Sequence, residues 1–155
     1  MTYQQRASHN RPSTRMRSLR LRLDMILSPS IRTPHMADFD YDETDPLTVS
    51  VTLHTLEGSV VRWIISRDLL FDGTEEPSGI GDVRLWPSVA GLRRVVLMRL
   101  EVQGVSCLFE MDLMHLQEWL LETFQLVHPG TEFDQVDWSA TVATLLGADR
   151  GHRGS

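Results

Sequence analysis

Hydrophobic and polar side chains alternate along several stretches of the chain, and a period of two residues predicts β-strands. Between residues 19 and 27 five apolar residues fall on one side of such a strand, opposite charged residues. The alternation returns at residues 47–53 and again after a reversal at Glu57-Gly58, which predicts a hairpin. Its inward-facing side chains are expected to be Leu47, Val49, Val51 and Leu53, opposite Val61, Trp63 and Ile65.

Three further alternating stretches predict strands at residues 82–86, 94–100 and 105–111. Gly79 and Gly81 precede the first of them, and we expect them to supply positive φ angles in a tight loop. The segment 28–46 carries three prolines and a cluster of acidic residues. It is therefore expected to be a long connection without regular structure.

The apolar spacing changes to three and four residues in the last third of the chain, which predicts helices. One helix is expected from about residue 111 to 127, with Asp112 as its N-cap. Its apolar stripe consists of Leu113, Leu116, Leu120, Phe124 and Val127. A second helix is expected from Asp137 to Leu146, ending at Gly147. Residues 67–71 predict a single helical turn.

Six strands and two helices with short connections predict an α+β fold built on a mainly antiparallel sheet. The length of 155 residues suits one domain. We place this domain at residues 18–148, between a polar tail at residues 1–17 and a short tail at residues 149–155. Because Met16 would also open the predicted domain, it is an alternative start.

The charge of the chain is distributed unevenly. Residues 1–17 contain four arginines and no acid, the rest has a net charge of −10, and the total is −6. An acidic body argues against a broad nucleic-acid surface, because phosphates need clustered cations. The basic tail is expected to be disordered, with contact to acidic lipid or nucleic acid as the alternative. With neither a transmembrane segment nor a secretory signal in view, a cytoplasmic protein is expected.

Candidate reactive groups lack the surroundings that catalysis requires. The glycines of GIGDVRLWPS precede a strand, whereas a phosphate loop follows a strand and opens a helix. Cys107, the single cysteine, is expected to be a small apolar residue. His115, Glu118 and Glu122 share a helical face that is expected to be solvated. The acids between Asp38 and Asp45 are expected in a flexible loop, and no cofactor or metal site is predicted.

Four tryptophans are candidates for partner contacts or for stacking on nucleic-acid bases. Trp63 and Trp138 fall on apolar faces and are expected in the core. Trp86 and Trp119 are harder to place in the core, and if exposed they become candidates for a partner surface, because aromatic residues concentrate binding energy.

Five sequence blocks occur in the order seen in one known family. They are Tyr41-Asp42, Asp45-Pro46, Arg67 to Leu70, Gly81 to Pro87 and Pro129 to Glu132. Together they resemble the signature of the SsgA-like proteins, the actinomycete sporulation and cell division family, over about residues 19–146.

The resemblance implies a non-catalytic homotrimer with a fold similar to the whirly-type single-stranded nucleic-acid-binding proteins. It also implies recruitment to the division septum, with action through partners such as the tubulin-like GTPase FtsZ or cell-wall proteins. The tail of about 17 residues and the segment Met36-Ala37-Asp38 depart from shorter members, so the particular task stays open among septum siting, FtsZ recruitment, spore-wall synthesis and spore separation.

Two functions from different classes therefore follow from the sequence. The first is a scaffold that recruits or positions division or cell-wall machinery, and the alternative is a single-stranded nucleic-acid binder. An enzyme acting on wall material is a third, disfavoured option, because no acid–base pair stands out. The candidate partner-surface residues are Arg67, Asp68, Asp82, Arg84 and Trp86. Each has a structural alternative, such as a cap at Asp68 or a cross-strand ion pair at Arg84.

Overall fold

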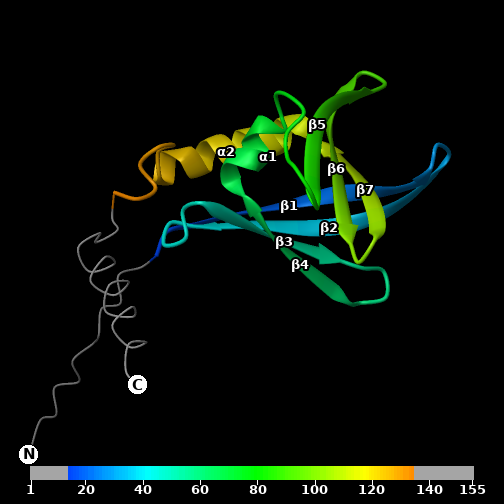
Figure 1. Cartoon of the computed structure of the whole chain (residues 1–155), viewed down its shortest axis with the longest axis horizontal. Helices are drawn as coiled ribbons and strands as arrows, with labels where there is room; N and C mark the ends of the chain where they lie inside the picture. The colour runs from blue at the N-terminus through cyan, green and yellow to red at the C-terminus, as the bar shows by residue number, and fades with distance from the viewer. Residues whose placement is uncertain (1–13, 135–155) are drawn as a thin grey trace, which may run out of the picture.

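A seven-stranded antiparallel sheet with two helices on one side forms the fold of the computed structural model (Figure 1), which describes residues 14–134. The strands are β1 (Met16–Ser28), β2 (Ile31–Asp42), β3 (Thr48–His54), β4 (Val60–Ser66), β5 (Val83–Ala90), β6 (Arg93–Val102) and β7 (Val105–Asp112). The helices are α1 (Arg67–Asp72) and α2 (Leu113–Leu126). The prediction of an α+β fold with a mainly antiparallel sheet is confirmed.

The sheet is curled and has the strand order β4-β3-β2-β1-β7-β6-β5. β1 and β2 form a long hairpin, whereas β1 meets β7 only at Asp24↔Glu110 and Met25↔Phe109. The short seam joins a β1–β4 half to a β5–β7 half. Figure 1 shows both helices on the same side of β1 and β2.

The predicted β3–β4 hairpin is confirmed, with Val51 opposite Trp63 and Leu53 opposite Val61. Two of its expected inward residues are less enclosed than predicted. Leu47 precedes β3 and is 40% exposed, and Val61 is 44% exposed because it lies near the hairpin turn. The core contacts of this hairpin therefore come mainly from residues nearer its other end.

Strand β2 contradicts the expectation of an irregular connection over residues 28–46, and its addition raises the strand count from six to seven. Ala37, Phe39 and Tyr41 are fully buried, while Asp38 and Asp40 between them lie on the opposite face. Asp38, Asp40 and Asp42 thus belong to a regular strand, so the flexible acidic loop was a wrong prediction for them, whereas Glu43 and Asp45 lie in the turn between β2 and β3. Ion pairs with β1 stabilise this arrangement.

Asp38 is central to these ion pairs. It accepts a hydrogen bond of 2.7 Å from Arg20 Nε, and its other oxygen lies 2.7 Å from His54 Nε2. The hydrogen bond from Arg20, followed by the contact with His54, lowers the pKa of Asp38 to about 2.

The folded protein should therefore lose stability through Asp38 as the pH falls from about 4, where an unfolded aspartate takes up a proton, to about 2. In Asp38→Asn this part of the loss should be missing, a difference of about 1 kcal/mol after allowance for solvent screening. Urea unfolding of both proteins at pH 2.5 and pH 6 measures it. Asp82→Asn is the control, because the Asp82 side chain makes no ion pair within the described chain. Equal pH dependence in all three proteins would contradict the prediction.

Helix α2 covers the inner face of the sheet, as its apolar stripe predicts. Asp112 caps it by accepting a hydrogen bond of 2.9 Å from the backbone N–H of His115, so the predicted N-cap is confirmed. Trp119 is only 4% exposed and packs edge to face on Phe39 at 6.1 Å. It is thus a core residue, so the condition of exposure that would make it a partner-surface candidate is not met.

The structure describes the N-terminal boundary of the predicted domain but not its C-terminal boundary. Met16 and Arg17, placed in the predicted tail, are the first residues of β1. The predicted helix from Asp137 to Leu146 lies outside the described residues.

Candidate partner-binding surface

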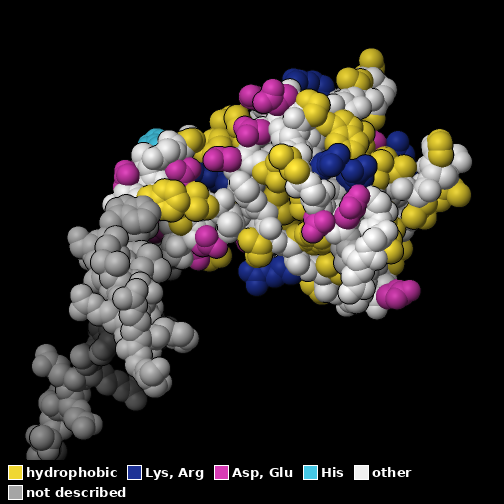
Figure 2. Space-filling model, in the orientation of Figure 1, with side chains coloured by type: hydrophobic (Ala, Val, Ile, Leu, Met, Phe, Trp, Pro, Cys, Tyr) yellow, Lys and Arg dark blue, Asp and Glu magenta, His cyan; other side chains and the backbone are white. Residues whose placement is uncertain are grey.

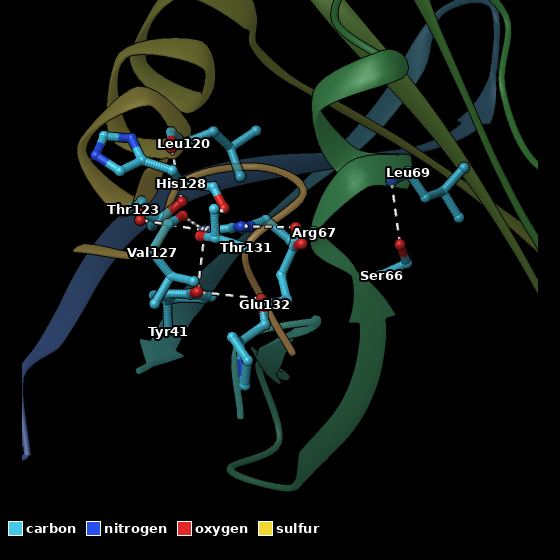
Figure 3. Close-up of polar contacts among 11 residues, drawn as sticks. Tyr41, Ser66, Arg67, Leu69, Leu120, Thr123, Val127, His128, Thr131 and Glu132 are labelled. Atoms are coloured by element: carbon cyan, nitrogen blue, oxygen red, sulfur yellow. Dashed lines mark hydrogen bonds and ion pairs between the residues drawn. The ribbon is translucent and has the colours of Figure 1, made fainter. Parts of the chain in front are cut away.

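Arg67, the first residue of α1, occupies the centre of a buried polar cluster (Figure 3). Its side chain is 1% exposed. Nη1 donates hydrogen bonds to Tyr41 Oη at 2.9 Å and to the backbone oxygens of Thr123 and Val127 at 3.1 and 2.8 Å. Nη2 lies 3.1 Å from Glu132 Oε1. Arg67 therefore joins β2, α1, the end of α2 and the segment after it.

The surroundings of Arg67 suit a buried cation. Its guanidinium lies 4.9 Å from the ring centre of Tyr41 and 4.6 Å from that of Phe124, within the range of cation–π attraction. It also donates to two carbonyl oxygens at the C-terminal end of α2, where the helix dipole favours a cation. Thr123 O accepts a second hydrogen bond from Val127 N. Burial raises the pKa of Tyr41 to about 12. The pKa of Glu132 is lowered, first by a hydrogen bond from its own backbone N–H and further by Arg67.

The position of Arg67 differs from the surface position that the sequence suggested, because its guanidinium is enclosed in the folded chain. Asp68 beside it is exposed in the first turn of α1. The N-cap is Ser66, whose hydroxyl accepts a hydrogen bond of 3.3 Å from Leu69 N, so Asp68 is not the cap. The structure thus separates these two residues from the other three candidates.

Asp82 directly precedes β5, and Arg84 and Trp86 lie in its first half. Arg84 and Trp86 alternate with the fully buried Leu85, so they share the outer face of the strand. Arg84 is exposed and Trp86 is half-buried. Asp82 is exposed, and its backbone oxygen accepts a hydrogen bond from Glu101 N at 2.9 Å.

A shallow pocket of about 280 Å³ lies beside Arg84 and Trp86. Its other lining residues include Ser78 and Gly79 from the preceding loop and Arg99 from β6. Arg99 lies directly opposite Arg84 in the strand register. The sequence analysis did not include Arg99 among the candidate residues. It could have been found from the antiparallel pairing of β5 with β6, because the register of the two strands places Arg99 opposite Arg84.

The loop before β5 is held against that strand by backbone contacts. Ser78 N and O both exchange hydrogen bonds with Leu85, at 2.8 and 3.0 Å. Gly79 has φ +100° and Gly81 has φ +84°, which confirms the predicted positive angles. The loop leads into β5 and forms one wall of the pocket.

Gly79→Ala is expected to lower the free energy of unfolding by about 1–3 kcal/mol. A Cβ atom at this position would lie 2.3 Å from Val83 O, in addition to the strain of the positive φ angle. Gly81→Ala is the matched control, since it shares the positive φ but would meet no atom within 4 Å. Chemical denaturation measures both, and an equal loss in the two variants would show that the close approach at Gly79 has no effect.

The remaining candidate groups lie apart from this surface. Within residues 14–134, no group of three or more His, Cys, Asp and Glu side chains is arranged to hold a metal ion. His115 contacts Asp112 at 3.3 Å, and Glu118 and Glu122 are exposed on α2. Cys107 is half-buried against the core and lines an apolar pocket with Met25 and Phe109.

Acidic side chains are spread along the helical part of the face drawn in Figure 2, where the arginines form separate groups. Non-specific nucleic-acid binding needs neighbouring cations along a path for the backbone. This face does not offer such a path.

Comparison with known proteins gives consistent matches. The family model of the Streptomyces sporulation and cell division protein SsgA matches residues 36–132. The sporulation-specific cell division protein SsgB of Streptomyces coelicolor is 35% identical over 83% of this chain and 94% of its own length. SsgB of Thermobifida fusca is 34% identical over 80% of this chain and 90% of its own length.

Two solved structures have the same fold. One comes from work on SsgB mutations that correlate with longitudinal cell division during sporulation of S. coelicolor. It has a TM-score of 0.76 at 36% identity, covering 78% of this chain and 95% of that one. The other is the crystal structure of an SsgA-like sporulation-specific cell division protein of T. fusca, with a TM-score of 0.76 at 32% identity, covering 85% and 96%.

No helix among the described residues has both the length and the hydropathy needed to cross a membrane. The order of the sequence blocks, the curled seven-stranded sheet and the matches over nearly the whole length of several relatives agree with one another. The chain therefore belongs to the SsgA family of sporulation and cell division proteins.

Proposed function

We propose that this protein acts without catalysis in sporulation-specific cell division, where it recruits or positions division or cell-wall machinery at the septum. The observation that carries the proposal is its similarity, along most of its length, to proteins named for sporulation-specific cell division. The pocket beside Arg84 and Trp86 supports a role through contact, because arginine and tryptophan are enriched where interfaces concentrate their energy.

Asp82, Arg84 and Trp86 form the partner surface in this proposal. They come from one strand and the turn before it, and Arg84 and Trp86 point to the same side. Asp68 is a separate exposed residue, and Arg67 contributes by holding α1 and the end of α2 in place. FtsZ and cell-wall synthesis proteins are the partners to test first.

Association into a homotrimer is part of the same proposal. Strand β4 is one edge of the sheet and exposes Val60, Val61 and Ile64. Apolar side chains on an open edge favour association that covers them. Light scattering coupled to gel filtration measures the mass in solution, and a monomer at micromolar concentration would contradict the trimer.

The function is tested in sporulating cells of the source organism. A fluorescent fusion followed by time-lapse imaging is expected to gather at sporulation septa, and a pull-down is expected to contain FtsZ or a wall-synthesis protein. A deletion strain should form abnormal septa, spore walls or spore chains. Normal septation, wall formation and spore release in that strain would overturn the proposal.

A further inference from the structure

Two arginines face each other on the outer side of the β5–β6 pair. Arg84 and Arg99 are register partners, and residues opposite one another in an antiparallel pair have Cβ atoms about 4.5–5.5 Å apart. Arg84 makes no hydrogen bond or ion pair among the described residues, and Arg99 has one long contact, 3.8 Å from Nη2 to Glu101 Oε1. Like charges placed opposite each other destabilise a sheet. An anion held between them would relieve this repulsion.

The charges around the pocket favour a negative ligand group. Among the residues that line it, Arg84 and Arg99 are the charged ones. The nearest acids along the two strands are Asp82, two residues before Arg84, and Glu101, two residues after Arg99. They lie side by side beyond the start of β5 and do not line the pocket. The site therefore has two cations inside and its acids at one end.

Trp86 adds an apolar contact beside the two cations. It is two residues from Arg84 on the same face of β5 and opposite Leu97 on β6, and it lines the same pocket. Arginine binds carboxylates through paired hydrogen bonds, and tryptophan packs against apolar and aromatic groups. A ligand that fits both has a carboxylate next to a hydrophobic side chain.

We propose that this pocket binds an acidic segment of a protein partner, with an Asp or Glu carboxylate between Arg84 and Arg99 and an adjacent apolar side chain against Trp86. This rests on the proposed function and gives the chemistry of the partner's docking segment. A protein segment is favoured over nucleic acid or anionic lipid, because those need a longer basic surface than two arginines.

The full-length protein is tested with a synthetic peptide, acetyl-Glu-Phe-Asp-amide, and its uncharged analogue, acetyl-Gln-Phe-Asn-amide. Binding is followed by nuclear magnetic resonance at the Trp86 indole N–H and the arginine Nε–H signals. The acidic peptide is expected to shift the Trp86, Arg84 and Arg99 signals, with an affinity at least tenfold above that of the analogue. Equal shifts with both peptides, or none with either, would overturn the proposal.

Arg84→Glu and Arg99→Glu are each expected to reduce the affinity for the acidic peptide at least tenfold. Arg94→Glu is the matched control, because it makes the same charge change on an exposed arginine of the same hairpin, opposite Val89. If a reversal disturbs folding, Arg84→Gln tests the same contact with a smaller change. If Arg94→Glu lowers the affinity for the acidic peptide by the same factor, the effect comes from the net charge of the protein, and a specific site is contradicted.

Two further ligands distinguish the source of the anion. An eight-residue oligothymidylate and vesicles containing phosphatidylglycerol are expected to bind more weakly than the acidic peptide at 150 mM salt. If either ligand shifts the Arg84 and Arg99 signals and binds more tightly than the acidic peptide, the assignment to a protein segment is overturned. These measurements use purified protein and do not depend on the septal function. If the acidic peptide binds as expected but the deletion strain sporulates normally, the proposed function is refuted while the binding site is supported.

Discussion

Replacement of Arg67 by methionine is expected to lower the free energy of unfolding by about 3–5 kcal/mol, the loss typical of a buried ion pair from which one partner is removed. Methionine fills much of the same space but donates no hydrogen bond. The Glu132 carboxylate, whose side chain is only 7% exposed, would then be buried without its ion-pair partner. Tyr41 Oη, Thr123 O and Val127 O would each lose a hydrogen-bond donor. Urea denaturation followed by circular dichroism measures the change.

Two further variants separate the ion pair from the rest of the cluster. Glu132→Gln is expected to cost less than Arg67→Met, and the double variant less than the sum of the two, because the charges interact directly. Arg62→Met is the control: this exposed arginine donates one hydrogen bond to Ser50 Oγ and should lose at most about 1 kcal/mol. A loss in Arg67→Met no larger than in Arg62→Met would mean that the cluster contributes little.

Trp86→Ala is expected to reduce the binding of the septal partner by about 30-fold, the effect of removing an interface hot spot worth about 2 kcal/mol. Trp86 lies on the outer face of an edge strand, so its loss should leave the folded protein intact. The measurements are the amount of FtsZ or wall-synthesis protein in a pull-down and the septal signal of a fluorescent fusion.

Leu92→Ala is the matched control for Trp86, since Leu92 is a fully exposed apolar residue in the turn at the far end of the same hairpin. It should leave partner binding unchanged. Loss of folding in Trp86→Ala would assign this residue to the core. Normal septal recruitment of a folded Trp86→Ala protein would remove it from the partner surface.

Local pattern was sufficient to predict those elements whose two faces differ clearly. The β3–β4 hairpin and α2 were predicted because apolar residues repeat at two residues in the first and at three to four in the second. Strand β2 was missed because prolines and aspartates oppose strand formation locally. Its stability comes from Phe39 and Tyr41 in the core and from Arg20 across the hairpin, which are tertiary effects.

The role of Arg67 was beyond local pattern for a related reason. Its partners Tyr41, Thr123, Val127 and Glu132 lie between 26 and 65 residues away in sequence. Three of the five sequence blocks that identified the family contribute to this one cluster, through Tyr41, Arg67 and Glu132. Much of that signature therefore reports how the molecule is held together, and the Gly81 to Pro87 block is the one that contains the exposed pocket residues.

The loop at Ser78 has a consequence for how copies of this protein can join. It occupies part of the outer border of β5, and Pro87 in the same strand has no N–H to offer, so of the two edge strands β4 is the one with an open border for backbone pairing. Pairing of β4 with β4 of a second copy joins two molecules only, whereas a ring of β4-to-β5 pairings would need the border that the Ser78 loop occupies. A threefold ring that joins these two edge strands would therefore rely on side chains, so its contacts are open to change by point substitution in a way that a continuous backbone ladder is not.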